Sequence, residues 1–330
     1  MTIKKQSTNN VLITSSANIY PFIEYCEQNS INWHEIAQEC NLPTNKAGLV
    51  HWLPLKDLMQ FLHCLEKRYG YTVGIEVGRL VSMEQLSPTL AKKIRACDSL
   101  ESGIQCLIAE LTNLNNHIMI WTEKVEDQWW LCHRSCYQPS SIGFEQSEWF
   151  RSLTLISFCR HFLGENWRPH SAKLSSSSDN HHQLPESFKQ TSIEYGLKYG
   201  AIAIDVKEDF QPISQQEAEN NWHQAVTTLI RTYASLPWMS IDWFAKMLGM
   251  TKRTLQRKLK QENIIFKSLK ENAKKEKAIY LVINSDLPIH DIAEIVGYSD
   301  LSNFNRAFKG WTSMGPPTYR KTHRRSNDES

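Results

Sequence analysis

The sequence predicts two domains of different fold class: an α+β domain over residues 1–215 and an all-α domain over residues 221–325. The chain has 330 residues, and domains of roughly 100–200 residues make two the first expectation. The predicted strands all lie before residue 215, whereas helical spacing occurs in both parts of the chain. Charge is also uneven: residues 237–325 carry 17 Lys and Arg against 8 Asp and Glu, and residues 1–236 carry 20 against 25. A basic carboxyl-terminal part that follows an acidic amino-terminal part indicates a separate domain that binds a polyanion.

The first domain mixes helical and strand patterns. Apolar residues at helical spacing, such as Leu55, Leu58 and Leu62, predict helices. The β-rich texture after residue 117 predicts two strands around a turn at 126–128. Helices are expected over 18–40, from Pro54 to residue 69, near 72–82 and 87–96, from Ser99 to about 114, and over 148–163; strands are expected at 118–122, 129–132 and 200–207. Polar residues predict a loop at 175–182 and a lead into the second domain at 211–219.

The chain lacks the patterns of a secreted or membrane protein. No apolar run approaches the ~20 residues of a membrane helix, and no secretory signal is visible. We therefore expect a cytoplasmic protein without a membrane partner. All 8 cysteines (26, 40, 64, 97, 106, 132, 136 and 159) lie in the first half at irregular spacing. Free, mostly buried thiols are the expectation, because cytosolic disulfides are rare.

The basic part contains an internal repeat. IDWFAKMLGMT at 241–251 matches IHDIAEIVGYS at 289–299 with a constant offset of 48 residues. In each copy, apolar residues at helical spacing precede a glycine, Gly249 or Gly297, where a positive φ permits a sharp turn. Thr251 and Ser299 then stand where an N-cap is expected for the next helix. Small Ala245 and Ala293 let the helices of each copy approach closely.

The repeat predicts two helix-turn-helix motifs, whose second helices, 251–261 and 299–311, enter the major groove. A long helix over 265–283, with Leu269, Ala273 and Tyr280 on its inner face, joins them. If this helix matches the ~34 Å between successive major-groove faces, one chain can grip one side of a duplex. If it does not, one recognition helix stays off the bases or the DNA bends.

The outward faces of these second helices supply the candidate DNA contacts. Arg pairs with guanine and Asn or Gln with adenine, whereas Lys and helix N-termini mainly hold phosphates. The alternative is a merely solvated helix face. Asp300 would repel phosphate and is expected to support its own helix N-terminus. The predicted DNA-binding residues are Thr251, Lys252, Arg253, Gln256, Arg257, Lys260, Ser299, Ser302, Asn303, Asn305, Arg306 and Lys309; the buried edges are Leu255 with Leu259, and Leu301 with Phe304 and Phe308.

Residues 240–320 resemble the DNA-binding domain of AraC/XylS-type bacterial transcription regulators. The resemblance is carried by IAEIVGYSDLSNFNRAFKGWT at 292–312 and by Pro316, Pro317, Tyr319 and Arg320. It implies a seven-helix domain with two helix-turn-helix motifs. The chain departs from the family pattern at residues 313–316, where the Gly and Ser of the pattern are exchanged, which affects the turn and not the domain.

The first domain more weakly resembles the effector-sensing domain of the arabinose-binding-like subgroup of this family, through residues 55–59 and 74–78. This implies a small-molecule effector and a homodimer formed through the first domain, with no effector-binding residue assigned. The predicted function is a sequence-specific transcription regulator whose first domain senses a small molecule or mediates self-association.

Other chemistries find weaker support in the sequence. Cys132, His133 and Cys136 form the only tight Cys/His group, with no second pair to complete a zinc site; we expect them to be structural, and no cofactor or metal. A phosphate-binding glycine loop, a serine nucleophile elbow and an HExxH motif are absent from the sequence, so we expect no catalytic residue and no enzyme. Two alternatives stay open: an alkyl-transfer or redox enzyme using these cysteines beside a DNA-binding domain, and a general DNA-organising protein, against which the net charge of only +2 argues.

Overall fold

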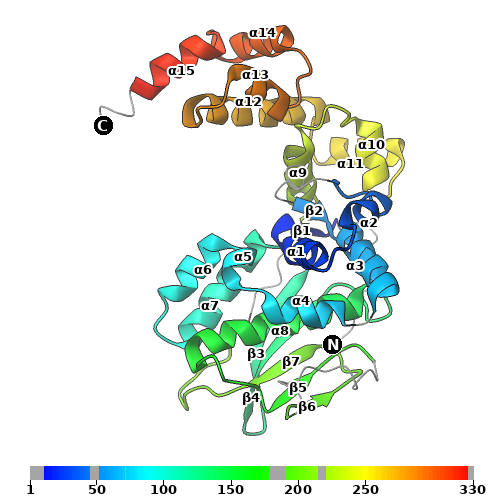
Figure 1. Cartoon of the computed structure of the whole chain (residues 1–330), viewed down its shortest axis with the longest axis vertical. Helices are drawn as coiled ribbons and strands as arrows, with labels where there is room; N and C mark the ends of the chain where they lie inside the picture. Colours follow the sequence, from blue (N-terminus) through cyan, green and yellow to red (C-terminus); the bar gives the residue numbers. More distant parts are fainter. Residues whose placement is uncertain (1–10, 45–51, 71, 178–189, 215–220, 326–330) are drawn as a thin grey trace. The chain divides into compact units, whose positions relative to one another are not determined.

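The computed structural model describes residues 11–44, 52–70, 72–177, 190–214 and 221–325. The chain divides into two compact units, Met1–Asn221 and Trp222–Ser330, called here the amino-terminal and carboxyl-terminal units. The first mixes helices with strands, and the described part of the second is helical (Figure 1). The predicted α+β and all-α fold classes are therefore confirmed.

The helices of the amino-terminal unit follow the predicted order. Pro54 is the residue immediately before α3, and Ser99 caps α7 by accepting a hydrogen bond from the backbone N–H of Ser102. One four-residue helix, α5, was not predicted. The helices are α1 (Tyr20–Gln28), α2 (Trp33–Glu39), α3 (Leu55–Tyr69), α4 (Val73–Leu80), α5 (Met83–Leu86), α6 (Pro88–Arg95), α7 (Leu100–Glu110) and α8 (Phe144–Leu163).

A five-stranded sheet has the strand order β3-β4-β7-β5-β6. The hairpin of β3 (Ile118–Val125) and β4 (Gln128–Ser135) was predicted, and its turn begins at Glu126 with a φ of 54°. β4 pairs antiparallel with β7 (Gly200–Ile204), which ends before the predicted residue 207. The unpredicted strands have three residues each, too few to show an alternating pattern: β1 (Ile13–Ser15), β2 (Trp52–Pro54), β5 (Ser171–Lys173) and β6 (Ser192–Glu194).

Helix α8 is the centre of the amino-terminal unit, because it packs against both α4 and the sheet. Gly74 and Gly78 lie one turn apart on α4, facing α8. A Cβ atom at Gly74 would overlap the backbone of Gln146, and one at Gly78 would crowd Leu153. These two glycines therefore allow the close approach of the two helices. None of the helices in the described part of the chain is long and apolar enough to cross a bilayer.

Two predicted polar segments are described only in part. Residues 178–182 of the predicted loop, including His181 and His182, lie outside the described residues. Residues 215–219 of the predicted lead into the second domain do as well.

The carboxyl-terminal unit contains seven helices within its described residues, 221–325. They are α9 (Trp222–Tyr233), α10 (Ile241–Met247), α11 (Lys252–Gln261), α12 (Phe266–Asn284), α13 (Ile289–Ile295), α14 (Leu301–Thr312) and α15 (Pro316–Arg325). Helix α12 is the predicted long helix between the two copies of the repeat. Its predicted inner face is wrong at Tyr280, which is 64% exposed. Ala278 and Val282 are buried instead, because the core formed with α13 and α14 faces that side of α12.

Candidate nucleic-acid interface

The first copy of the repeat forms a helical hairpin of α10 and α11. Gly249 turns the chain between the two helices with a φ of +69°. Thr251 caps α11, because its side chain accepts a hydrogen bond from the backbone N–H of Thr254. Leu255 and Leu259 are buried, as is Ala245 on α10. The predicted elements of this hairpin are therefore confirmed.

The second copy forms a matching hairpin of α13 and α14, with one correction. Gly297 has a φ of +81°, as predicted. The N-cap of α14 is Asp300 and not Ser299: the Asp300 carboxylate accepts a hydrogen bond from the backbone N–H of Asn303 over 2.7 Å. A carboxylate there both satisfies a free N–H group and complements the helix dipole. The helix consequently begins at Leu301, and Ser299 is an exposed residue of the turn.

The outward face of α11 carries exposed basic and polar side chains. Within the described part of the chain, Arg253, Gln256, Arg257 and Lys260 are exposed and have no side-chain partner. Lys252 is also exposed, but it pairs with Asp242 of α10 over 2.8 Å. Four of these predicted residues can therefore contact a ligand, whereas the positive charge of Lys252 is already paired with the carboxylate of Asp242.

The predicted DNA-binding residues of α14 differ in how exposed their side chains are. Ser302, Asn303, Arg306 and Lys309 are exposed, and Arg306 donates a hydrogen bond to Oδ1 of Asn303 over 3.2 Å. Asn305 is half-buried, and its Oδ1 atom is buried without a hydrogen-bond partner in the described structure. Its amide is therefore less accessible than those of the exposed residues.

The predicted buried edge of α14 is wrong at Leu301, which is 38% exposed. Aromatic rings fill the space behind α14 instead. Phe304 and Phe308 are fully buried and contact Tyr298 and Trp311 in tilted or edge-on arrangements. Such a core needs no further side chain from the first turn of the helix.

Three lysines of α12 have structural partners that sequence reasoning did not assign. Lys270 donates to the carbonyl oxygen of Met239 over 2.6 Å, Lys274 to that of Gly297 over 3.2 Å, and Lys277 to the Ser235 hydroxyl over 3.3 Å. Burial lowers the pKa of all three ammonium groups. The available signal was their spacing of four and three residues, which places them on one helix face. Part of the basic charge of this unit therefore holds the fold together.

The sequence of the carboxyl-terminal unit is similar to those of known helix-turn-helix proteins. A family model described as a helix-turn-helix domain matches residues 244–322. The carboxyl-terminal unit contains an AraC-type helix-turn-helix domain. Over 78 residues the chain is 37% identical to the HTH-type transcriptional regulator VqsM of Pseudomonas aeruginosa. This match covers 24% of each chain, so the chain spans about a quarter of the length of this curated relative.

Two solved structures are also similar. The C-terminal domain of AraT, a response regulator from Geobacillus stearothermophilus, is 34% identical, with 30% of this chain and 84% of that chain covered and a TM-score of 0.29. Transcriptional regulator CdpR from Pseudomonas aeruginosa is 14% identical, with 97% of this chain and 100% of that chain covered and a TM-score of 0.43.

The Cys/His group of the amino-terminal unit does not come together as one site. Cys132 and His133 are successive residues of β4 and point to opposite faces of the sheet. Cys132 packs among Trp130, Ala201 and Ala203, and burial raises the pKa of its thiol. His133 is buried on the other face, where its Nδ1 accepts a hydrogen bond from Arg151 and its Nε2 lies 3.1 Å from the Ser152 hydroxyl.

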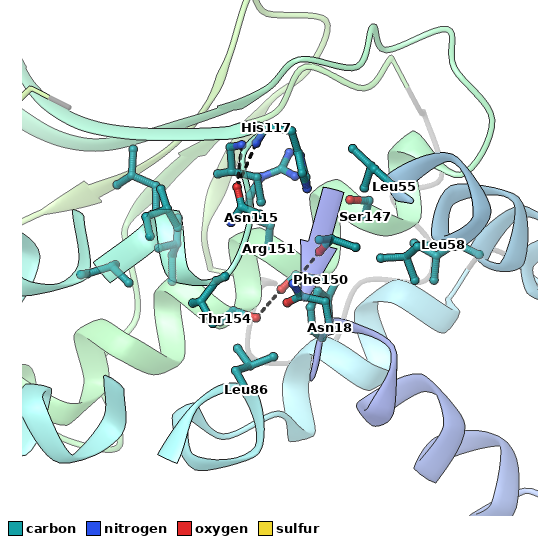
Figure 2. Close-up of a pocket in the computed structure, with 18 of the residues that line it drawn as sticks. Asn18, Leu55, Leu58, Leu86, Asn115, His117, Ser147, Phe150, Arg151 and Thr154 are labelled. Atoms are coloured by element: carbon teal, nitrogen blue, oxygen red, sulfur yellow. Dashed lines mark hydrogen bonds between the residues drawn. The ribbon is translucent and has the colours of Figure 1, made fainter. Parts of the chain in front are cut away.

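The amino-terminal unit contains a largely apolar cavity, which the sequence did not predict (Figure 2). It has a volume of about 90 Å³. A buried water occupies roughly 10–15 Å³ on this scale, so the cavity has room for several groups of that size. Trp129 and Trp130 of β4 are not among the residues that line it. The polar residues that line it are Thr14, Asn18, Asn115, His117, Ser147, Arg151 and Thr154.

Proposed function

We propose that this protein is a sequence-specific, DNA-binding transcription regulator of the bacterial AraC type. In this proposal the hairpins α10–α11 and α13–α14 are two helix-turn-helix motifs, and α12 is the long helix that joins them. The observation that carries the proposal is the repeated hairpin. Each copy has a glycine of positive φ, a capped second helix, and exposed polar residues on that second helix.

The roles of the individual contacts follow from their chemistry. Arg257 and Arg306 are proposed to read bases, because a guanidinium can form two hydrogen bonds with the edge of a guanine. Gln256 and Asn303 carry the amide that suits adenine. The remaining exposed residues hold phosphates or support the helix ends: Thr251, Lys252, Arg253, Lys260, Ser299, Ser302 and Lys309. Asn305 retains a proposed contact only through the exposed part of its side chain.

The amino-terminal unit is proposed to sense a small molecule or to mediate self-association as a homodimer, in a cytoplasmic protein. An effector changes DNA binding only if it prefers one state of the chain; equal binding to both states shifts nothing. The cavity between α3, α7, α8 and β3 supports the sensing role, because ligand sites are typically apolar clefts with a few polar groups.

An enzyme that uses the cysteines has less support. A nucleophilic cysteine needs a lowered pKa and access to its substrate. Cys132 has the opposite environment, since it is fully buried and its thiol pKa is raised. Mass spectrometry after exposure to alkylated DNA tests this alternative: a stoichiometric adduct on Cys132 or Cys136 would favour it over the regulator.

Fluorescence titration of the full chain with labelled genomic fragments tests the proposed function. We expect a few fragments to bind about a thousandfold or more tightly than random DNA at physiological salt. Uniform affinity for all fragments would contradict sequence-specific regulation and favour a general DNA-organising protein.

A further inference from the structure

We propose that the cavity of the amino-terminal unit binds a small monocarboxylate with an apolar body, and that Arg151 and His117 hold its carboxylate group. This inference rests on the proposed sensing function of the unit and names the chemical class of its effector. It is carried by two buried polar groups at a cavity whose walls are otherwise mostly aliphatic.

The apolar walls select an apolar ligand body. Leu58 and Leu62 come from α3, Leu107 from α7, and Leu86 and Leu155 from α5 and α8. Burial of apolar ligand surface against such side chains stabilises the complex. In Figure 2, His117, Asn115 and Arg151 lie together on one side of the cavity, and Leu86 lies away from them. His117, Asn115 and Arg151 thus form one polar group of the lining, while Thr154 and Asn18 lie nearer to Leu86.

Arg151 is a buried cation with unused donors. Its side chain is 7% exposed, and its Nε donates to Nδ1 of His133 over 2.9 Å. Among the residues that the structure describes, this is its only hydrogen bond, and no carboxylate lies within ion-pair distance of it. Glu148, one turn earlier on α8, accepts the backbone N–H groups of Ser175 and Ser176 over 2.8 Å each.

A guanidinium in such a place attracts an anion. Burial lowers the pKa of Arg151, and the charge of Glu148 partly opposes this. An arginine nevertheless stays protonated, so a buried charge without an ion-pair partner is costly. Its terminal N–H groups form a planar fork that matches the two oxygens of a carboxylate.

His117 supplies the second polar group. The residue is 4% exposed, and its Nε2 atom is buried without a hydrogen-bond partner in the described structure. Its backbone N–H donates to Oδ1 of Asn115 over 3.2 Å, and its Nδ1 lies 3.3 Å from the Ser135 hydroxyl. Asn115 therefore holds the backbone of His117, and Ser135 at the end of β4 contacts its ring. An unpaired buried polar atom costs free energy that a ligand can recover.

The protonation state of His117 suits a carboxylate acceptor. Burial, followed by the positive charge of Arg151, lowers the pKa of His117 to about 3, so the ring is neutral near pH 7. When Nδ1 accepts from the Ser135 hydroxyl, the proton of the neutral ring is on Nε2, which can then donate to a carboxylate oxygen. A ligand ammonium would instead meet the like charge of Arg151.

Calorimetric titration of the full chain without DNA tests this inference. The probes are butanoate, hexanoate and octanoate, with 1-hexanol and hexylamine as neutral and cationic ligands of matched body. We expect hexanoate to bind about tenfold or more tightly than 1-hexanol, because hydrogen bonds to charged groups contribute more than neutral ones. Equal affinity for hexanoate and 1-hexanol, or absence of binding by every probe, would overturn the inference.

Variants locate the carboxylate. His117→Phe keeps a ring of similar shape and removes the donor, and Arg151→Gln removes the charge. Each should weaken carboxylate binding about tenfold or more and leave binding of the alcohol unchanged. Arg134→Gln is the matched control, because Arg134 is exposed on β4 and should have no effect. Unchanged carboxylate affinity in a folded His117→Phe protein would contradict the assignment, even if Arg151→Gln fails to fold.

Failure of this inference is distinguishable from failure of the proposed function. Binding of genomic fragments is measured without any carboxylate, and binding of carboxylates is measured without DNA. Selective DNA binding without carboxylate binding would overturn only the ligand class. Uniform DNA binding together with selective carboxylate binding would overturn only the regulator.

Discussion

Lys274 of α12 donates a hydrogen bond to the carbonyl oxygen of Gly297, the turn residue of the second hairpin, over 3.2 Å. The same ammonium group lies 4.7 Å from the centre of the Tyr298 ring. The long helix thus holds the turn that precedes α14. Lys274 therefore has a structural role. It differs in this from the exposed basic residues, which are proposed to contact DNA.

Lys274→Met should therefore lower the free energy of unfolding by about 1–2 kcal/mol, since it leaves the Gly297 carbonyl without this donor. The salt dependence of DNA binding should stay the same, because Lys274 is not proposed to neutralise a phosphate. Urea unfolding and salt-dependent titration measure the two effects. Lys267→Met, at an exposed position of the same helix, should change stability by less than ~0.5 kcal/mol. Equal stability of the two variants would contradict the role of Lys274.

The two turn glycines form a matched pair. Gly249→Ala introduces a Cβ at a φ of +69° with no atom nearby, so only backbone strain of about 1–2 kcal/mol is expected. Gly297→Ala adds an overlap of the Cβ with the Ser235 carbonyl oxygen, and its loss of stability should be clearly larger. Denaturant unfolding of both variants measures the difference. An equal loss at the two positions would show that the Ser235 backbone moves freely.

Arg257→Ala and Arg306→Ala test base reading. Each should weaken binding to the preferred fragment by about 1–3 kcal/mol and relax the preference at one base position. Binding to a library of single-base variants of the fragment provides the measurement. A uniform loss on every sequence, with a salt slope reduced by about 1, would identify the side chain as a phosphate contact.

Acidification should destabilise the amino-terminal unit through its buried histidines. Burial lowers the pKa of His117 to about 3 and that of His133 well below the ordinary 6.5. Between pH 3 and pH 6.5 these two histidines bind more protons in the unfolded chain than in the folded chain. The free energy of unfolding therefore falls as the pH drops below 6.5. Urea unfolding across this range measures the slope, which should be shallower in His117→Phe. An unchanged slope in that variant would contradict a neutral His117.

Asp57 should oppose this trend. Burial raises its pKa from 3.8 to about 7, with the charge of Lys56 acting in the other direction. The folded state then holds the proton between these values, so the stability contributed by Asp57 is lost as the pH rises through 7. Asp57→Asn removes this opposing effect, and its stability should fall more steeply on acidification than that of the parent protein. A slope equal to that of the parent would mean that Asp57 is ionised in the folded chain.

The features that could be predicted were local. Gly249 and Gly297 marked two turns because each follows a helical apolar pattern, and Thr251 marked a helix start because of its position after the glycine. The N-cap of α14 was misassigned because Ser299 and Asp300 are both good caps, and only the backbone shows that the helix begins after Asp300. Long-range contacts decide the rest.

The cavity and the buried lysines depended on such long-range contacts. His117, Arg151 and Leu58 are distant in sequence, and no pattern predicts that they line one cavity. Lys270, Lys274 and Lys277 contributed to the basic charge that suggested a polyanion, yet their partners lie 23 to 42 residues away. Charge counted along a sequence does not distinguish a surface cation from one that holds a connecting segment against a helix.

We propose that α11 and α14 of one chain enter successive major grooves on one side of the duplex. Hydroxyl-radical footprinting on the preferred fragment tests it most directly, at a protein concentration that saturates the site. We predict two protected segments about 10–10.5 base pairs apart on the same face of the DNA, of which Arg257→Ala weakens one and Arg306→Ala the other. A single protected segment that both variants weaken would contradict the claim.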